Sequence, residues 1–159
     1  WLSETPETPS RGWDGACNRT VTWVELLDRT SGKTFFYSNT HLDHQGKQAR
    51  EEGIKLLVET VGTIAGKAPA ILGGDFNSPT DSPIFRPLTK CMKSAREKAP
   101  VSDNEGTFNG FGSAPDTIVI DHIYFRGKLR CQRFETLKGD YGAPYISDHY
   151  PIAAVFAFQ

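Results

Sequence analysis

Apolar and polar residues alternate in the first part of the chain in the manner of a β-hairpin. From Thr20 to Leu27 the side chains alternate with a period of two, which is typical of a strand. A polar turn follows at Asp28–Gly32, and Lys33 to Leu42 is rich in the aromatic and β-branched residues that favour strands. We therefore expect the two segments to pair, and we expect residues 1–19, rich in Ser, Thr, Pro and Gly, to form an irregular loop.

A period close to 3.6 residues then predicts a helix from Gln45 to about Ala65. Its apolar stripe is formed by Ile54, Leu57, Val58, Val61 and Ile64. The next residue is Gly66, and glycine commonly ends helices, so we expect the helix to stop there.

The second half of the chain alternates short apolar runs with polar segments. Strands are predicted at Ala68–Gly73, Thr117–Arg126, Leu129–Leu137 and Ile152–Phe158. A short helix capped by Asp81 or Ser82 is predicted to end near Leu88, and residues 98–117 and 138–147 are predicted loops. Strands interrupted by one long helix indicate a mixed α/β fold, and 159 residues is about the length of a single domain, 1–159.

Composition and charge narrow the range of partners. The chain carries 18 Lys and Arg against 19 Asp and Glu, a formal net charge of −1, so it lacks the basic surface that non-specific nucleic-acid binding uses. An anionic substrate would need local positive charge or a bound cation. No apolar run approaches the roughly 18 residues of a membrane span. Three cysteines argue against a framework of disulfides but leave one bridge with one free thiol open, and no cellular compartment is assigned.

Two segments place polar side chains at the ends of predicted strands. Residues 39–44 (NTHLDH) end the second strand, where Asn39 and His41 share a face. Residues 73–79 (GGDFNSP) follow the buried strand, and there Asp75 and Asn77 alternate around an apolar phenylalanine. The alternatives are a surface loop with a hydrogen-bonded histidine in the first segment and an Asx turn in the second.

Two further segments add a carboxylate and an imidazole. Asp121 lies in an otherwise apolar strand, and a buried carboxylate requires a partner, for which an imidazolium is suited. The neighbouring His122 points to the opposite face and is interpreted as structural. Asp148 and His149 precede the last strand and face opposite sides, so His149 is a candidate partner for Asp121. The alternative here is a simple loop in which Asp148 forms a turn.

The types of residue in these segments favour one kind of chemistry. The chain has no Cys/His zinc spacing, no G-x-S-x-G nucleophile motif and no phosphate-binding P-loop motif. Asp, His and Asn at several strand ends instead suggest oxygen-ligand metal chemistry on a phosphate ester.

Four motifs in order resemble the endonuclease/exonuclease/phosphatase (DNase I-like) superfamily. They are SNTHLDH (38–44), GGDFNS (73–78), IDHIYF (120–125) and SDHYP (147–151), and residues 1–23 look like the bacterial branch. The resemblance implies a four-layer α/β/β/α sandwich. It also implies that this chain corresponds to the C-terminal portion of such a domain, incomplete at its N-terminus, because the family's early Asn and metal-binding Glu have no counterpart. A sheet face would then be exposed, and a missing N-terminal segment would be a partner.

The same resemblance implies Mg²⁺-dependent hydrolysis of phosphate esters by in-line attack of water, with Mn²⁺ as an alternative cation. Asp75 would orient or deprotonate the water, and Asn77 would bind that water or a phosphoryl oxygen. His149, held by Asp121, would act as general acid or base. His41 would donate to a phosphoryl oxygen, and Asp148 would be the carboxylate nearest the metal.

A small or medium phosphate ester is the favoured substrate class, for example a phosphorylated sugar, a phosphodiester or a lipid headgroup. Asn39, Arg19 and Phe108 are the candidate substrate-binding residues; a surface ion pair is the alternative for Arg19, and packing in the core is the alternative for Phe108. Two other functions stay open: a nuclease of the same superfamily, and a catalytically inactive fragment or binding module that lacks the upstream metal ligands.

Overall fold

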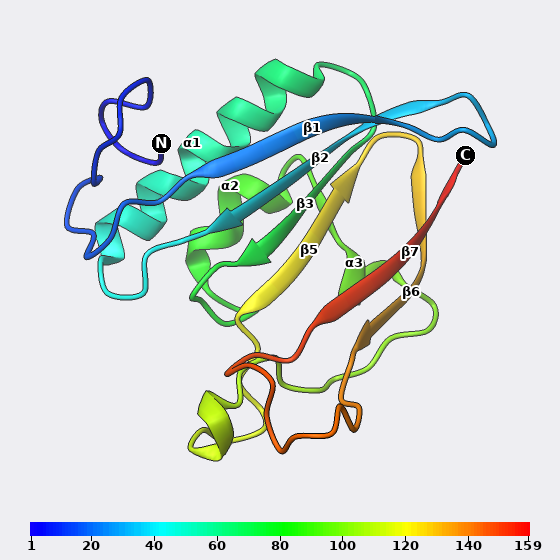
Figure 1. Cartoon of the computed structure of the whole chain (residues 1–159). Coiled ribbons are helices and arrows are strands. Elements are labelled where there is room, and N and C mark those ends of the chain that lie inside the picture. The colour runs from blue at the N-terminus through cyan, green and yellow to red at the C-terminus, as the bar shows by residue number, and fades with distance from the viewer.

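A five-stranded sheet forms the centre of the fold in the computed structural model, which describes residues 1–159 (Figure 1). Its spatial order is β1-β2-β3-β5-β4, and only β2 and β3 are parallel. A second, two-stranded sheet pairs β6 with β7. The strands are β1 (Val21–Leu27), β2 (Thr34–His41), β3 (Ala70–Asp75), β4 (Lys93–Ser94), β5 (Asp121–Arg126), β6 (Leu129–Thr136) and β7 (Ile152–Phe158). The predicted hairpin at the start of the chain is therefore confirmed.

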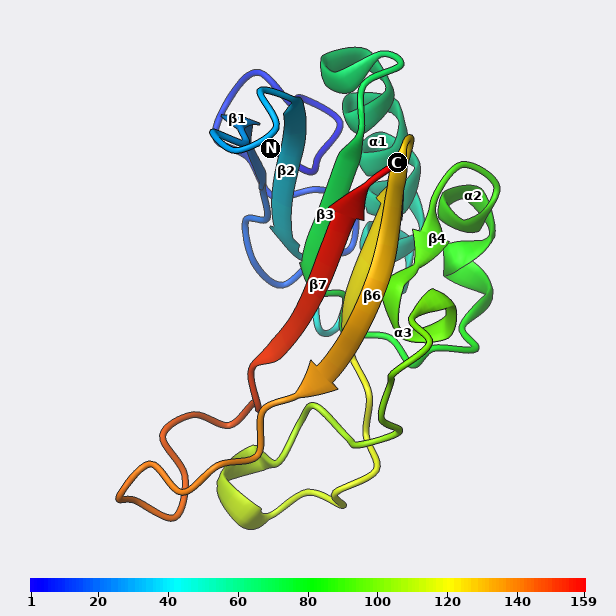
Figure 2. The ribbon, with the colours of Figure 1, turned by 90° about the vertical axis from the view of Figure 1, so that its right-hand side faces the viewer.

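The helices α1 (Lys47–Ala65) and α2 (Arg86–Thr89) cover one side of the large sheet, while α3 (Ala95–Lys98) packs against β5 and β6 (Figure 2). The other helical elements are the single 3₁₀ turns η1 (Pro83–Phe85) and η2 (Gly110–Gly112). The predicted stripe of α1 buries Ile54, Leu57 and Val61 against Leu72 and Tyr124 of the sheet. None of the helices has the length and apolar character needed to cross a membrane.

The other side of the large sheet packs against the second sheet. Ile71 and Phe125 from β3 and β5 meet Leu129 and Phe134 from β6 in a second apolar core. The described layers are thus helices, five-stranded sheet and two-stranded sheet. Beyond the second sheet, β1 and β2 carry a row of half-exposed apolar side chains, Val24, Leu26 and Tyr37, which corresponds to the exposed sheet face that was expected.

Several predicted boundaries shift. The strand expected from Thr117 begins only at Asp121, because residues 117–120 bond instead to the neighbouring loop and to Phe76. The expected short helix is a 3₁₀ turn followed by α2, and neither Asp81 nor Ser82 provides the predicted side-chain cap. All three cysteines are free, so the alternative with one disulfide is wrong.

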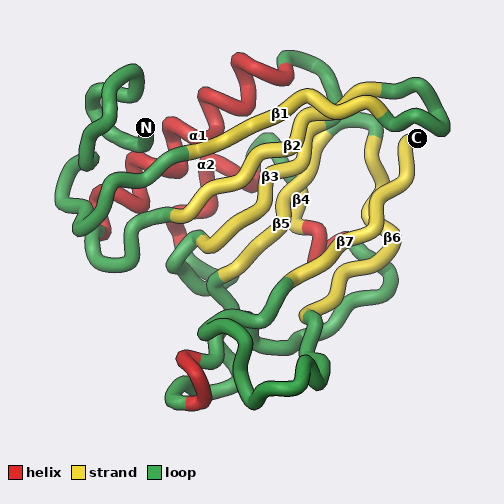
Figure 3. Tube along the Cα trace, in the orientation of Figure 1, coloured by secondary structure: helices red, strands yellow, loops and turns green.

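The loop of residues 1–20 has no helix or strand, as predicted, but it is anchored to the rest of the fold. The carboxylate of Asp14 accepts hydrogen bonds from the backbone N–H groups of Gln48 and Ala49 in the first turn of α1. This contact satisfies two of the N–H groups that a helix leaves unpaired at its start. The same loop brings Cys17 and Arg19 beside Asp43 and His44, just after β2. The loops of residues 99–120 and 137–151 lie together at the lower end of the molecule (Figure 3).

Candidate active site

The registers of three neighbouring strands bring three predicted site residues into one row. His41 at the end of β2 is opposite Asp75 at the end of β3, which is opposite Asp121 at the start of β5. Residues opposite one another in a sheet point to the same face. The close packing of β2 and β3 here requires Gly74, because a Cβ atom at that position would lie 1.9 Å from the backbone oxygen of Thr40.

Asp75 lies at the centre of this row. One carboxylate oxygen is 3.1 Å from His41 Nε2, and the other accepts the backbone N–H of Asn77 at 2.7 Å. Burial favours the neutral form of Asp75, but the bonds from His41 and Asn77 outweigh it and lower the pKa of the carboxyl. The Asx-turn alternative is therefore correct for the local geometry, and this same turn holds a charged carboxylate in the row.

Asn77 is tied to the same two segments. Its Nδ2 donates to the backbone oxygen of Leu42 at 2.9 Å and lies 3.4 Å from Asp75 Oδ2. Its backbone is left-handed, with φ of 47°, which asparagine tolerates better than most residues. The side chain thus orients Asp75 and links the end of β3 to the end of β2.

His149 is the partner that the sequence required for Asp121. Its Nδ1 lies 2.8 Å from Asp121 Oδ2, while its Nε2 lies 3.8 Å from Asp75 Oδ2. Because a carboxylate can only accept, Nδ1 carries a proton and Nε2 faces the site. Burial opposes the imidazolium, but the carboxylates of Asp121, Asp75 and Asp148 raise the pKa of His149 above its ordinary value.

Two cavities meet at this row and share His41 and Asp75. The first, of about 450 Å³, also holds Arg19, Phe108 and Asp148. The second, of about 340 Å³, extends over the sheet face and holds Asn39. The structure therefore places Asn39 in a different cavity from the other two candidate substrate-binding residues.

The remaining predictions for single residues are resolved by their contacts. Phe108 is half-buried and packs edge-on against His149, with ring centroids 5.0 Å apart, so it lines the cavity without entering the core. His122 is buried on the opposite face, where its Nε2 bonds the backbone oxygen of Ser78 at 2.9 Å, as its structural interpretation predicted.

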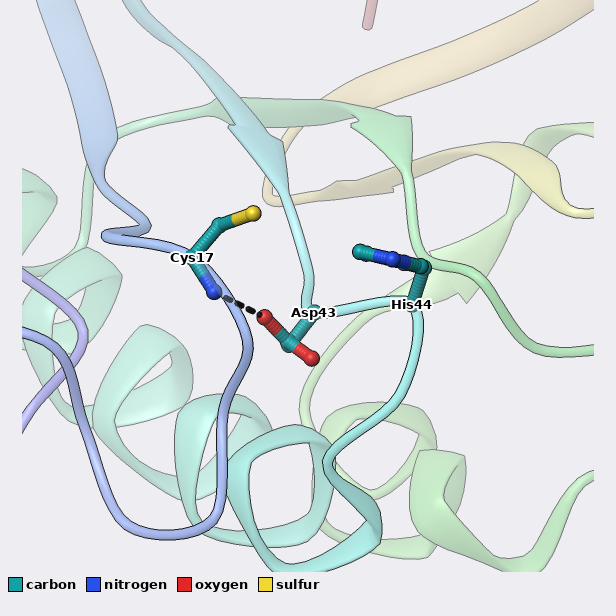
Figure 4. A group of neighbouring side chains, drawn as sticks. All are labelled: Cys17, Asp43 and His44. Atoms are coloured by element: carbon teal, nitrogen blue, oxygen red, sulfur yellow. Dashed lines mark hydrogen bonds between the residues drawn. The ribbon is translucent and has the colours of Figure 1, made fainter.

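Groups able to hold a metal ion gather in two places. At the row, Asp75 and Asp121 together with the adjoining His149 offer ligand atoms that all lie within 4.8 Å of one another. Asp148 lines the adjoining cavity but does not belong to this group. The second group, Cys17, Asp43 and His44, lies beside the site in the N-terminal loop and after β2 (Figure 4).

Thr107 is a residue of the site that the sequence did not indicate. It is fully buried, and its hydroxyl oxygen accepts the backbone N–H groups of Ile120 and Asp121 at 3.0 and 3.1 Å. Its backbone oxygen accepts the N–H of Tyr150, next to His149. The only sequence signal was a threonine followed by an aromatic residue within a predicted loop, which is too weak to single out this position.

We expect Thr107→Val to lower the pKa of His149, measured by NMR titration of the imidazole, because the segment that holds Asp121 against His149 loses two hydrogen bonds and the contact between the two side chains weakens. Leaving two buried N–H groups without an acceptor should also cost about 1–3 kcal/mol of unfolding free energy. Thr107→Ser keeps the hydroxyl and should keep the pKa of His149. An unchanged pKa in the valine variant would contradict this role.

Comparisons with known proteins agree with this arrangement. The model of the Endonuclease/Exonuclease/phosphatase family matches residues 5–149. A protein of that family from Bacteroides vulgatus is 32% identical, with a TM-score of 0.91 over 100% of this chain and 63% of its own. A mannosyl-6-phosphatase from Bacteroides thetaiotaomicron is 31% identical, with a TM-score of 0.86 over 99% of this chain and 64% of its own.

A curated relative extends the same picture. The uncharacterized protein L388 of Acanthamoeba polyphaga mimivirus is 26% identical over 98% of this chain and 63% of its own length. The chain thus spans just under two thirds of the length of each of these three proteins. Because the family model covers most of the chain and the strands carry the DNase I-like arrangement, this chain belongs to the endonuclease/exonuclease/phosphatase family.

Proposed function

We propose that this site hydrolyses phosphate esters with the help of a divalent cation. The observation that carries the proposal is the convergence of two imidazoles on one carboxylate: His41 Nε2 and His149 Nε2 lie 3.1 and 3.8 Å from Asp75 Oδ2. A tetrahedral anion placed beside Asp75 would meet an N–H donor on each side. Hydrolysis of a phosphate ester requires mainly such positioning and neutralisation of charge.

Each residue has a separate part in this proposal. Asp75, kept charged by its hydrogen bonds, accepts a proton from the attacking water and orients it. His149 in its protonated form donates from Nε2 to a phosphoryl oxygen or to the leaving group, while Asp121 fixes its ring. The Nε2–H of His41, which bonds Asp75 in the free site, turns to a second phosphoryl oxygen when substrate binds, and Asn77 holds Asp75 in place.

The donor set of the cavity fits a hard cation. Mg²⁺ prefers oxygen ligands and keeps several of its waters, so one or two carboxylates are enough, and both Asp75 and Asp148 line the cavity. When bound, such a cation would neutralise negative charge on the phosphoryl oxygens. We propose Mg²⁺, with Mn²⁺ as the alternative.

A small phosphate ester, in particular a phosphorylated sugar, is the proposed substrate. The net charge of −1 provides no extended basic surface for a polynucleotide, and a relative that is 31% identical is a mannosyl-6-phosphatase. Activity of a nuclease is the alternative. Phosphate release from a hexose 6-phosphate, an aryl phosphate and an oligonucleotide, each with Mg²⁺ or Mn²⁺, separates the two. Faster cleavage of the oligonucleotide would overturn the proposed substrate class, and no turnover of any ester would overturn the proposed function for this chain.

Asp121→Asn is expected to shift the dependence of the rate on pH. His149 acts while protonated, so the rate falls as pH rises through its raised pKa. Removing the Asp121 charge lowers that pKa, and the alkaline fall of the rate should move to lower pH by about one to two pH units. The measurement is kcat/KM from pH 5 to 9 for both proteins. An unmoved alkaline limb would remove Asp121 from the proposed mechanism.

A further inference from the structure

One wall of the larger cavity is formed by two residues that the proposed chemistry does not use. Arg19, from the N-terminal loop, and His44, just after β2, line the same cavity as His41, Asp75 and His149. The Arg19 Nη2 lies 3.2 Å from His44 Nδ1. The two side chains are thus coupled to each other and face the space next to the proposed phosphoryl site.

Asp43 fixes the position of this pair. Its two carboxylate oxygens accept four backbone N–H groups, those of Ala16, Cys17, Gln45 and Gly46, all at 2.8–2.9 Å. Burial opposes its charge, but these bonds outweigh burial and hold the pKa of Asp43 well below the ordinary range. Asp43 therefore joins the N-terminal loop to the end of β2 as a permanently charged link.

The same four hydrogen bonds to the Asp43 carboxylate argue against a metal ion bound by Cys17, Asp43 and His44. Each oxygen of Asp43 already accepts two N–H groups, which occupy its lone-pair directions. In Figure 4 the carboxylate points to the backbone of Cys17, while the Cys17 thiol and the His44 ring lie beside it. The guanidinium of Arg19, 3.7 Å from Asp43 Oδ2, adds a positive charge where a cation would have to enter.

The Arg19 and His44 pair is rich in hydrogen-bond donors. The side chain of Arg19 is mostly buried, with 14% exposed, and its contact with His44 is its only side-chain hydrogen bond within the protein. Because a guanidinium can only donate, His44 Nδ1 is the acceptor and the ring carries its proton on Nε2. The remaining Nη hydrogens and the Nε2–H of His44 are available to an oxygen-bearing ligand.

The same cavity also has apolar lining residues. Phe108, Ile118 and Ile120 line it, and all three are partly exposed. A cavity that offers hydrogen-bond donors together with aromatic and aliphatic side chains suits a ring that carries hydroxyl groups on its edge and C–H groups on its face. The charge of Arg19 is already balanced by Asp43, and Asp75 and Asp148 add negative charge, so the cavity favours neutral oxygens over a second anion.

We propose that Arg19 and His44 form a subsite for the hydroxyl groups of a sugar phosphate, next to the site for its phosphate. This inference rests on the proposed function and deepens it, because it names the part of the substrate that sets specificity. Cys17 and Asp43 support the subsite through the loop contacts and do not bind the ligand.

Binding measurements test the subsite without depending on turnover. Calorimetric titration with a hexose 6-phosphate and with inorganic phosphate, both with Mg²⁺ and in a His149→Ala background that suppresses hydrolysis, should give tighter binding of the hexose phosphate. Arg19→Gln should lower the ratio of the two affinities at least tenfold, because a hydrogen bond from a charged donor is lost. His44→Gln should lower this ratio by a smaller factor. Arg29→Gln, an exposed arginine in the turn between β1 and β2, is the matched control and should keep the preference.

The possible outcomes separate the two proposals. Binding of neither ligand would overturn the proposed function together with the subsite. Equal weakening of both ligands in Arg19→Gln, or no preference while Arg19 is intact, would overturn the subsite alone. The remaining outcome is a hexose bisphosphate that binds more tightly than the monophosphate, with the gain lost in Arg19→Gln. That result would overturn the assignment of the subsite to hydroxyl groups, because it would show that the subsite binds a second phosphate. Arg19→Lys keeps the charge but not the planar fork of the guanidinium, so it should lose an intermediate part of the preference. Because a misfolded subsite would keep no preference, this variant also checks that the loss in Arg19→Gln does not reflect misfolding.

Discussion

His149→Ala is expected to lower kcat for phosphate-ester hydrolysis by about 10³-fold or more, the range that general acid–base groups contribute. The reason is geometric. The imidazole is the only group that contacts Asp121 at 2.8 Å and also faces Asp75, so no neighbour can replace its proton donor. Steady-state kinetics with an aryl phosphate and Mg²⁺ measure the loss.

Two controls make the result for His149 interpretable. His122→Gln removes a histidine that lies on the opposite face of the sheet, and its kcat should stay within a few-fold of the unaltered chain. The thermal unfolding midpoint of His149→Ala should show that the fold is kept. A folded His149→Ala protein with nearly unaltered kcat would remove His149 from the reaction.

Asp75→Asn is expected to have an effect of similar or greater size, about 10³- to 10⁴-fold in kcat/KM. The carboxylate is the common partner of His41 and His149, and it is one of the two oxygen donors proposed for the cation. An amide keeps the shape and can still accept from Asn77, but it cannot accept a proton or balance an imidazolium. The variant should therefore lose both catalysis and cation affinity.

Cation titration distinguishes these two losses. The concentration of Mg²⁺ that gives half-maximal rate should rise in Asp75→Asn and should stay unchanged in His149→Ala. If Asp75→Asn keeps the affinity for Mg²⁺ but loses kcat, Asp75 acts on the water alone. If it keeps kcat, the row of His41, Asp75 and Asp121 is not the catalytic centre.

Local pattern was enough to predict much of the fold and part of the site. The period of α1, the hairpin of β1 and β2 and the closing strand depend on side chains a few residues apart, which a sequence displays directly. The requirement that a buried Asp121 find a partner also follows from local chemistry, and the structure pairs it with His149 at 2.8 Å.

What the sequence could not supply are contacts between segments far apart in the chain. Thr107 reaches Asp121 across a loop, and Arg19 reaches His44 because Asp43 joins the N-terminal loop to β2. The strand expected from Thr117 starts late for the same reason, since its first residues bond to other loops. None of these contacts produces a periodic pattern of residues from which it could be predicted.

The central claim is that His41 and His149 face one site for a phosphoryl group, and imidazole NMR tests it most directly. Titration of the ¹⁵N-labelled chain with inorganic phosphate in the presence of Mg²⁺ should shift the Nε2 resonances of His41 and His149 together, with one saturation curve. The buried His122 provides an internal reference that should not move. Separate curves for His41 and His149, or no shift of either at saturating phosphate, would contradict the site described above.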